Sequence, residues 1–168
     1  MSGHSKWSQI KHKKAITDKI KSRSFAKLSR IITIAARKGV DPRSNVQLSQ
    51  AIERARADNM PNDNIQRAIN RVGDKDSQNL EELFIEALGQ DGIAIKIKAI
   101  TDNRNRTMSE LRQILGDFNF KVSQPGSLAW IFNQPKINLD NTSGELVSKL
   151  IEALDENDSV GDITSNIE

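Results

Sequence analysis

The sequence predicts an α+β protein: an N-terminal three-helix bundle followed by an α+β domain with a mainly antiparallel sheet and two helices. Apolar residues recur at helical spacing up to about residue 72, and they alternate with a period of two in several later segments. The charge changes sign at the same place. Residues 1–72 contain 16 Lys/Arg and 5 Asp/Glu, whereas residues 73–168 contain 9 and 17. We therefore expect two domains, a basic arm with a helical bundle at 1–75 and the α+β domain at 81–168.

Three amphipathic helices account for most of the first half. One is expected from about residue 15 to 38, where Gly39 stops it, and a second over 45–58. A third begins with Asn62 as its N-cap and ends at Gly73. A polar, basic arm precedes them and a polar linker, 73–80, follows. The residues expected to face the common core are Leu28, Ile31, Ile32, Ala35, Leu48, Ala51, Ile52, Ala55, Ile65, Ala68, Ile69 and Val72.

The second half predicts the order strand, strand, helix, strand, helix, strand. The strands are expected at 81–88, 92–101, 127–133 and 160–167, and residues 89–92 form the turn between the first two. Capping boxes predict the two helix starts, because a Thr and a Glu three residues later can cap each other's backbone N–H groups. These pairs are Thr107 with Glu110, before a helix to about residue 117, and Thr142 with Glu145.

Several function classes find no support in the residues. There is no cysteine, which excludes disulfides, thiolate catalysis and cysteine–zinc sites. The two histidines, His4 and His12, have no carboxylate near them in the chain, so we expect neither a metal site nor a catalytic triad. No phosphate-binding glycine motif occurs. No apolar run approaches the roughly 18 residues of a membrane helix, and no signal-peptide core is evident. We expect a cytoplasmic protein without enzymatic activity, cofactor, metal or membrane contact.

The basic arm is the first candidate for a binding site. Lysines that neutralise phosphates release counterions, and this favours association with nucleic acid. Its single aromatic residue, Trp7, has two possible roles: it stacks on an unpaired base, or it pins the arm onto the bundle. The candidate residues are Lys6, Trp7, Lys11, His12, Lys13 and Lys14.

Two further candidates lie on helices. The first helix has a positive stripe within an arc of about 80° beside its apolar face, and this stripe could follow a phosphate backbone or be an ordinary solvated surface. It consists of Lys19, Arg23, Lys27, Arg30 and Arg37. The segment Asn103, Arg104, Asn105 and Arg106 leads into a helix N-terminus, where free N–H groups attract phosphate. Its alternative role is a capped turn.

Four separated motifs resemble the YebC/PmpR family in the family's order. Gly3-His4-Ser5-Lys6-Trp7, continued by residues 10–15, is similar to the family's opening. The others are residues 59–69, with Asn59-Met60-Pro61; residues 101–107; and residues 126–132, with Gly126-Ser127. The resemblance covers nearly the whole chain. It implies an N-terminal helical bundle, an α+β domain and a third domain inserted into the second.

This sequence departs from the family pattern in two places. The stretch at 133–141 is short where the family continues into its third domain, so we expect that domain to be missing there. The family's glycine-rich turn before the second strand is altered, at residues 87–92. Functions of the third domain would then not carry over, whereas those of the arm, the bundle and the Asn-Arg segment would.

The resemblance also implies a function. Family members are described as transcriptional regulators that bind DNA, mitochondrial relatives as translational activators of cytochrome oxidase subunit I, and bacterial members are linked to ribosomes stalled on proline runs. We expect a monomeric regulator that binds ribosomal RNA or tRNA on the ribosome, since a basic arm with one tryptophan suits an irregular RNA surface. A DNA-binding transcriptional regulator is the alternative. A third hypothesis is an adaptor whose acidic second half binds a basic protein.

Overall fold

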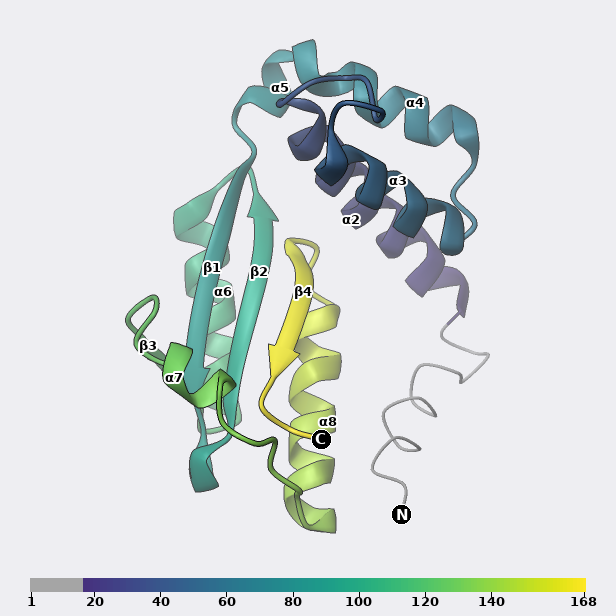
Figure 1. Ribbon diagram of the computed structural model, residues 1–168. Helices are drawn as coiled ribbons and strands as arrows, with labels where there is room; N and C mark the ends of the chain where they lie inside the picture. The colour runs from purple at the N-terminus through teal and green to yellow at the C-terminus, as the bar shows by residue number, and fades with distance from the viewer. Residues whose placement is uncertain (1–16) are drawn as a thin grey trace.

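The computed structural model describes the backbone of residues 17–168 and the side chains from residue 24 onward. Helices α2 (Thr17–Ala36), α3 (Val46–Ala57) and α4 (Asn62–Asn70) form a bundle at one end of the molecule (Figure 1). A four-stranded sheet occupies the other end. Helices α6 (Arg104–Asp117) and α8 (Asn141–Asp155) cover one face of this sheet, and the short α7 (Ala129–Phe132) lies over part of the other. The predicted α+β class is confirmed.

The bundle forms because each helix has one apolar face. Leu28 and Ile32 of α2, Leu48 of α3 and Ile65 of α4 are almost fully buried in one cluster. Polar side chains also tie the helices together. Thr33 of α2 donates its hydroxyl to the backbone oxygen of residue 68 in α4, at 2.8 Å. Burying this hydroxyl costs little because it is hydrogen-bonded. Because the bond joins one residue of α2 to one residue of α4, it also fixes the register between the two helices.

Asn45 closes the connection between α2 and α3. Its side-chain oxygen accepts from the backbone N–H of Leu48, as expected of an N-cap. Its amide nitrogen donates to the carbonyls of Ala35 and Gly39 at 2.8 and 2.7 Å. One buried side chain therefore satisfies the end of one helix and the start of the next. Gly39 adopts a φ of 140°, which a residue with a side chain rarely takes.

The ends of α4 differ from the prediction. Asn62 is the first residue of the helix, and Pro61 stands at the N-cap position without a side-chain cap. Gly73 does not cap α4, because a 3-10 turn, η2 (Arg71–Gly73), continues it. The expected linker 73–80 contains a further helical turn, α5 (Lys75–Gln78), in which Ser77 is buried and donates its hydroxyl to the Asp74 carbonyl.

The sheet has the strand order β3-β1-β2-β4, and all three pairings between named strands are antiparallel. β1 (Glu81–Leu88) and β2 (Ala94–Thr101) pair along their full length around the turn η3 (Gln90–Gly92), close to the predicted bounds. β4 (Val160–Ser165) confirms the last predicted strand. The side chains that alternate inward from β1 and β2 pack against α6 and α8, so burial follows the period of two.

The predicted strand at 127–133 is wrong. The third strand is the shorter β3 (Lys121–Ser123), and the predicted segment forms the helical turn α7. Leu128 and Ile131, three residues apart, are buried, whereas Trp130 is 64% exposed. The apolar pattern therefore follows a helical period. The turn before it, at Gly126 with a φ of 82°, separates the two elements.

Both predicted capping boxes are also wrong. α6 begins three residues earlier than Thr107, and the side chain of Asn103 caps it by accepting from the N–H of Arg106. α8 begins at Asn141, and Asp140 caps it by accepting from the N–H of Ser143 at 2.7 Å. Asn and Asp are at least as effective as Thr at an N-cap. Thr107 is instead fully buried inside α6.

Candidate nucleic-acid interface

The described part of the predicted stripe on α2 faces the α+β domain. Lys27 donates to the backbone carbonyl of Asp155 and lies 3.5 Å from its carboxylate, with its side chain only 11% exposed. Arg30 donates to the carbonyl of Asp158 at 2.9 Å. Asp155 is the last residue of α8, where carbonyls without helical partners give the helix end a partial negative charge. These two cations therefore hold the bundle against the end of α8.

Arg37 and Arg54 make similar contacts at other points. Arg37 donates to the carbonyls of Leu80, at 2.7 Å, and Ser77, so it binds the connection to the sheet. Arg54 of α3 forms an ion pair with Asp162 of β4 at 2.7 Å. Each such surface contact contributes about 0–1 kcal/mol. Intramolecular contacts thus engage Lys27, Arg30 and Arg37, and a bound nucleic acid would have to compete for them.

The other predicted cations of this region cannot be placed. Lys19 and Arg23 belong to α2, but their side chains lie outside the described part of the chain. Lys6, Trp7, Lys11, His12, Lys13 and Lys14 also lie outside the described residues. Their role in binding stays a prediction.

The Asn-Arg segment has the geometry of a capped turn. Asn103 caps α6, and the guanidinium of Arg106 lies 2.9 Å from Asp102 and 3.8 Å from Glu110. Arg104 lies 4.0 Å from Glu81. Asn105 is exposed. Both arginine side chains remain more than half exposed, so a phosphate could reach them, but it would compete with three carboxylates.

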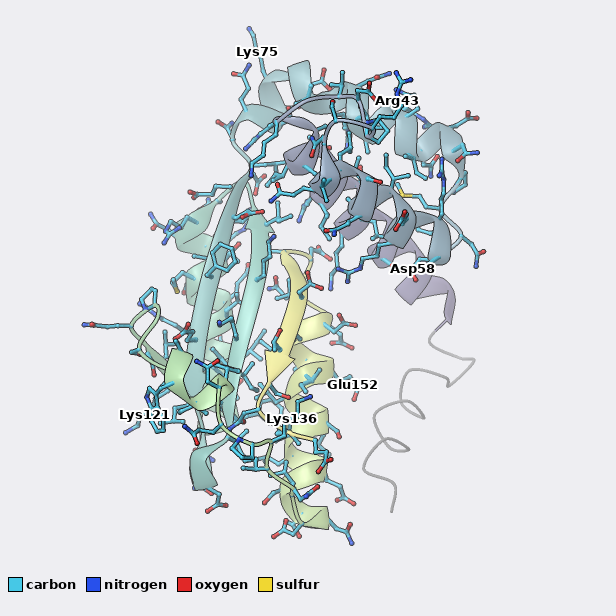
Figure 2. The ribbon with its side chains drawn as sticks, in the orientation of Figure 1. Arg43, Asp58, Lys75, Lys121, Lys136 and Glu152 are labelled. Carbon is cyan, nitrogen blue, oxygen red and sulfur yellow. The ribbon has the colours of Figure 1, made fainter. Side chains whose placement is uncertain are left out.

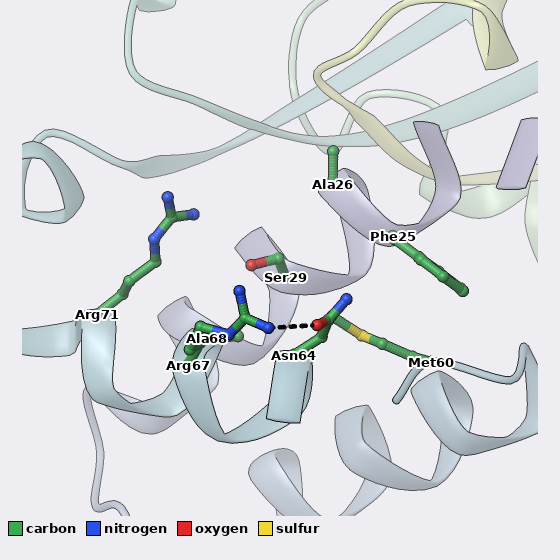
Figure 3. Close-up of a pocket in the computed structure, with 8 residues that line it drawn as sticks. All are labelled: Phe25, Ala26, Ser29, Met60, Asn64, Arg67, Ala68 and Arg71. Carbon is green, nitrogen blue, oxygen red and sulfur yellow. Dashed lines mark hydrogen bonds between the residues drawn. The ribbon is translucent and has the colours of Figure 1, made fainter. Parts of the chain in front are cut away.

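A pocket of about 280 Å³ lies between α2 and α4 on the bundle (Figure 3). Small residues leave the space: Ala26 and Ser29 come from α2 and Ala68 from α4. Phe25 and Met60 add apolar wall. The sequence alone did not predict this pocket, although the four-residue spacing of Arg67 and Arg71, at the end of α4 and the start of η2, was visible.

Arg67 and Arg71 line the polar side of the pocket, one helical turn apart. Arg67 donates to the side-chain oxygen of Asn64 at 3.0 Å, as Figure 3 shows, and to the backbone of Asp63. No carboxylate among the described residues forms an ion pair with either arginine. The pocket therefore combines an apolar wall with two guanidinium groups that can donate hydrogen bonds to a phosphate.

The outer face of the sheet exposes aromatic side chains. Phe84 is 49% exposed with Lys98 over its ring at 5.8 Å, and Lys96 lies 4.9 Å above Phe132. These two lysines also form ion pairs with Glu86 and Glu82. The pairing leaves this face without the excess positive charge that attracts a polyanion.

Two carboxylates have a shifted pKa with a clear structural cause. The guanidinium and backbone N–H of Arg43 hold the pKa of Asp41 below its ordinary value of 3.8. Hydrogen bonds from Ser143 lower the pKa of Asp140 in the same way. Asp41, which is partly exposed, serves a turn, and Asp140, which is exposed, serves a helix cap. Within residues 24–168, no three His, Asp or Glu side chains cluster as a metal site would require.

The fold and the distribution of charge define a two-part protein, in which a basic helical bundle is joined to an acidic α+β unit. Residues 5–75 match the model of the TACO1/YebC protein N-terminal domain, and residues 80–137 match that of the TACO1/YebC second and third domain. The chain therefore belongs to the TACO1/YebC family. None of its described helices is long and apolar enough to cross a membrane.

Individual relatives support the same assignment. A "probable transcriptional regulatory protein" of Chloroflexus aurantiacus is 50% identical over 137 residues, which are 80% of this chain and 54% of that protein. A protein of the same name from Syntrophomonas wolfei is 41% identical over 91% of this chain and 64% of its own. The chain thus spans little more than half the length of these relatives. These names describe regulatory proteins rather than enzymes.

A solved structure shares the fold. The crystal structure of a conserved hypothetical protein, Aq1575, from Aquifex aeolicus superimposes with a TM-score of 0.80 at 27% identity, over 96% of each chain. Together with the family models, it confirms the family and the fold that the sequence motifs predicted.

Proposed function

We propose that this chain is a non-enzymatic, nucleic-acid-binding regulator of gene expression that acts on ribosomal RNA or tRNA during translation. The observation that carries the proposal is the segregation of charge onto the two halves of the fold. Residues 1–72 contain 16 Lys/Arg and 5 Asp/Glu, whereas residues 73–168 contain 9 and 17. A polyanion is attracted to the first half and repelled by the second. The proposal treats 1–75 and 81–168 as separate domains, with no inserted domain near 133–141.

The contacts of the described residues change which cations we assign to the interface. Lys27, Arg30 and Arg37 hold the bundle to the rest of the protein, so they are not part of the proposed primary contact. Arg104 and Arg106 form a secondary contact, because their ion pairs are exposed and weak. The primary contact consists of Lys6, Trp7, Lys11, His12, Lys13, Lys14, Lys19, Arg23, Arg67 and Arg71.

A DNA-binding transcriptional regulator is the second candidate, and the names of the relatives favour it. Translation is our first choice because an arm with a single tryptophan suits unpaired RNA better than a regular groove. We further propose that the protein is a monomer and that it acts in the cytoplasm.

Sedimentation of cell lysate through sucrose gradients distinguishes the two candidates. We expect the protein to comigrate with ribosomes and to be released by a high-salt wash, because phosphate contacts weaken steeply with salt. If it is missing from ribosome fractions even when translation is stalled, and is recovered with chromosomal DNA, the transcription candidate replaces this one.

A further inference from the structure

We propose that the pocket between α2 and α4 binds one unpaired nucleotide of single-stranded RNA. The inference rests on one part of the proposed function, the binding of nucleic acid by the basic half, and it adds where and how one nucleotide is held. The base would enter against Phe25 and Met60, and its phosphate would lie on Arg67 and Arg71.

The size of the pocket suits a single base. Small-molecule sites usually begin at roughly 300 Å³, and this pocket measures about 280 Å³. A stacked duplex cannot enter such a space, whereas a base that has left its stack can. Proteins that recognise RNA by sequence or shape commonly take unpaired bases in this way.

The chemistry of the walls matches the parts of a nucleotide. Phe25 is half-buried and packs on the bundle core, and Met60 is 5% exposed. Aromatic and thioether side chains both make favourable contacts with a flat ring. Ser29 and Asn64 also line the pocket, and they carry a hydroxyl and an amide that can hydrogen-bond a base edge or a ribose 2′-hydroxyl.

The two arginines give the pocket its preference for an anion. They lie four residues apart, Arg67 in α4 and Arg71 at the start of η2, which continues that helix, so their guanidinium groups can meet the same or adjacent phosphates. Among the described residues, Arg67 bonds to neutral groups, the Asn64 side chain and the Asp63 carbonyl. A phosphate that binds here need not break an ion pair within that part of the chain, whereas at Arg104 or Arg106 it must compete with carboxylates.

Filling the pocket is the most specific test. The full-length protein is titrated into a short, fluorescein-labelled single-stranded oligouridine, and binding is followed by fluorescence anisotropy. We expect Ala26→Leu to weaken binding roughly tenfold, because the new side chain occupies the space of the base. The salt slope should not change. The matched control, Ala57→Leu, places the same side chain on an exposed residue of α3 outside the pocket and should bind like the wild type.

Charge removal tests the phosphate contact. We expect the double variant Arg67→Ala/Arg71→Ala to lower the salt slope of binding by about 2. The control double variant Arg43→Ala/Lys75→Ala removes the same charge from two exposed residues that do not line the pocket, Arg43 between α2 and α3 and Lys75 in α5 (both labelled in Figure 2), and should leave the slope unchanged. Circular dichroism melts are recorded for every variant to check that it is folded.

The outcomes separate this inference from the proposed function. If the wild type binds no nucleic acid, the proposed function fails and the pocket fails with it. If the wild type binds RNA but Ala26→Leu binds equally well, only the pocket is refuted. The same holds if the two charge double variants reduce the salt slope of binding by the same amount. Equal binding and equal sensitivity with oligothymidine DNA would overturn the assignment to RNA.

Discussion

Replacing Thr107 by Val tests how the start of α6 is held. The Thr107 hydroxyl lies 2.8 Å from that of Thr101 and 3.2 Å from that of Ser159, and both threonines are fully buried. Valine keeps the shape but removes both hydrogen bonds and leaves two hydroxyls short of a partner. Each lost bond costs about 1 kcal/mol, and an unsatisfied buried group costs 1–3 kcal/mol. We expect a loss of about 2 kcal/mol, which lowers the melting temperature by roughly 4–8 °C.

Thr142→Val is the matched control for this variant. Thr142 is exposed in the first turn of α8, and Asp140 rather than Thr142 caps that helix. Differential scanning calorimetry measures the melting temperature of both variants, and the structure predicts almost no change in it for the control. If the capping boxes suggested by the sequence were real, both variants would lose about 1 kcal/mol. Equal losses, or no loss at Thr107, would refute the buried hydroxyl cluster.

Three further predictions concern a glycine, a cap and the arm. Gly89→Ala should destabilise by about 1–3 kcal/mol in urea unfolding, because its Cβ would come within 2.6 Å of the buried Phe120 ring; Gly116→Ala, with open space in α6, should instead gain roughly 0.5–1 kcal/mol. Asp140 stabilises α8 while its carboxylate is ionised, so its contribution is complete above pH 3.8 and is lost as the pH falls through its lowered pKa. Asp140→Asn should remove this acid dependence in melts across that range, and an unchanged dependence would contradict the cap. Alanine at three lysines of the arm should reduce the salt slope of RNA binding by up to about 3, whereas an unchanged slope would show that they touch no phosphate; these are Lys11, Lys13 and Lys14.

Periodicity predicted most of the fold because it depends on local sequence. α2, α3 and the β1–β2 hairpin lie within a few residues of their expected bounds. The prediction of secondary structure failed where the apolar residues of a short segment fit both the period of a strand and the period of a helix. In residues 127–133, a strand with a period of two and a helical turn with a period of three or four both place apolar residues together. Only the burial of Leu128 with Ile131 decides for the turn.

The site was harder to predict because its contacts join distant parts of the chain. A helical wheel placed Lys27 and Arg30 on a positive stripe, but their partners are Asp155 and Asp158, 128 residues away. A helical wheel predicts the direction in which a side chain points, but it does not predict which residues of another domain that side chain will contact. The pocket likewise depends on the packing of α2 against α4, which no single helix reveals.

Crosslinking tests the central claim most directly. The full-length protein is bound to single-stranded RNA, irradiated with ultraviolet light and digested, and the crosslinked peptides are identified by mass spectrometry. The charge segregation predicts crosslinks within residues 1–72, including the arm and α4, which are lost at high salt. Crosslinks confined to residues 81–168 would contradict the assignment of nucleic-acid binding to the basic half.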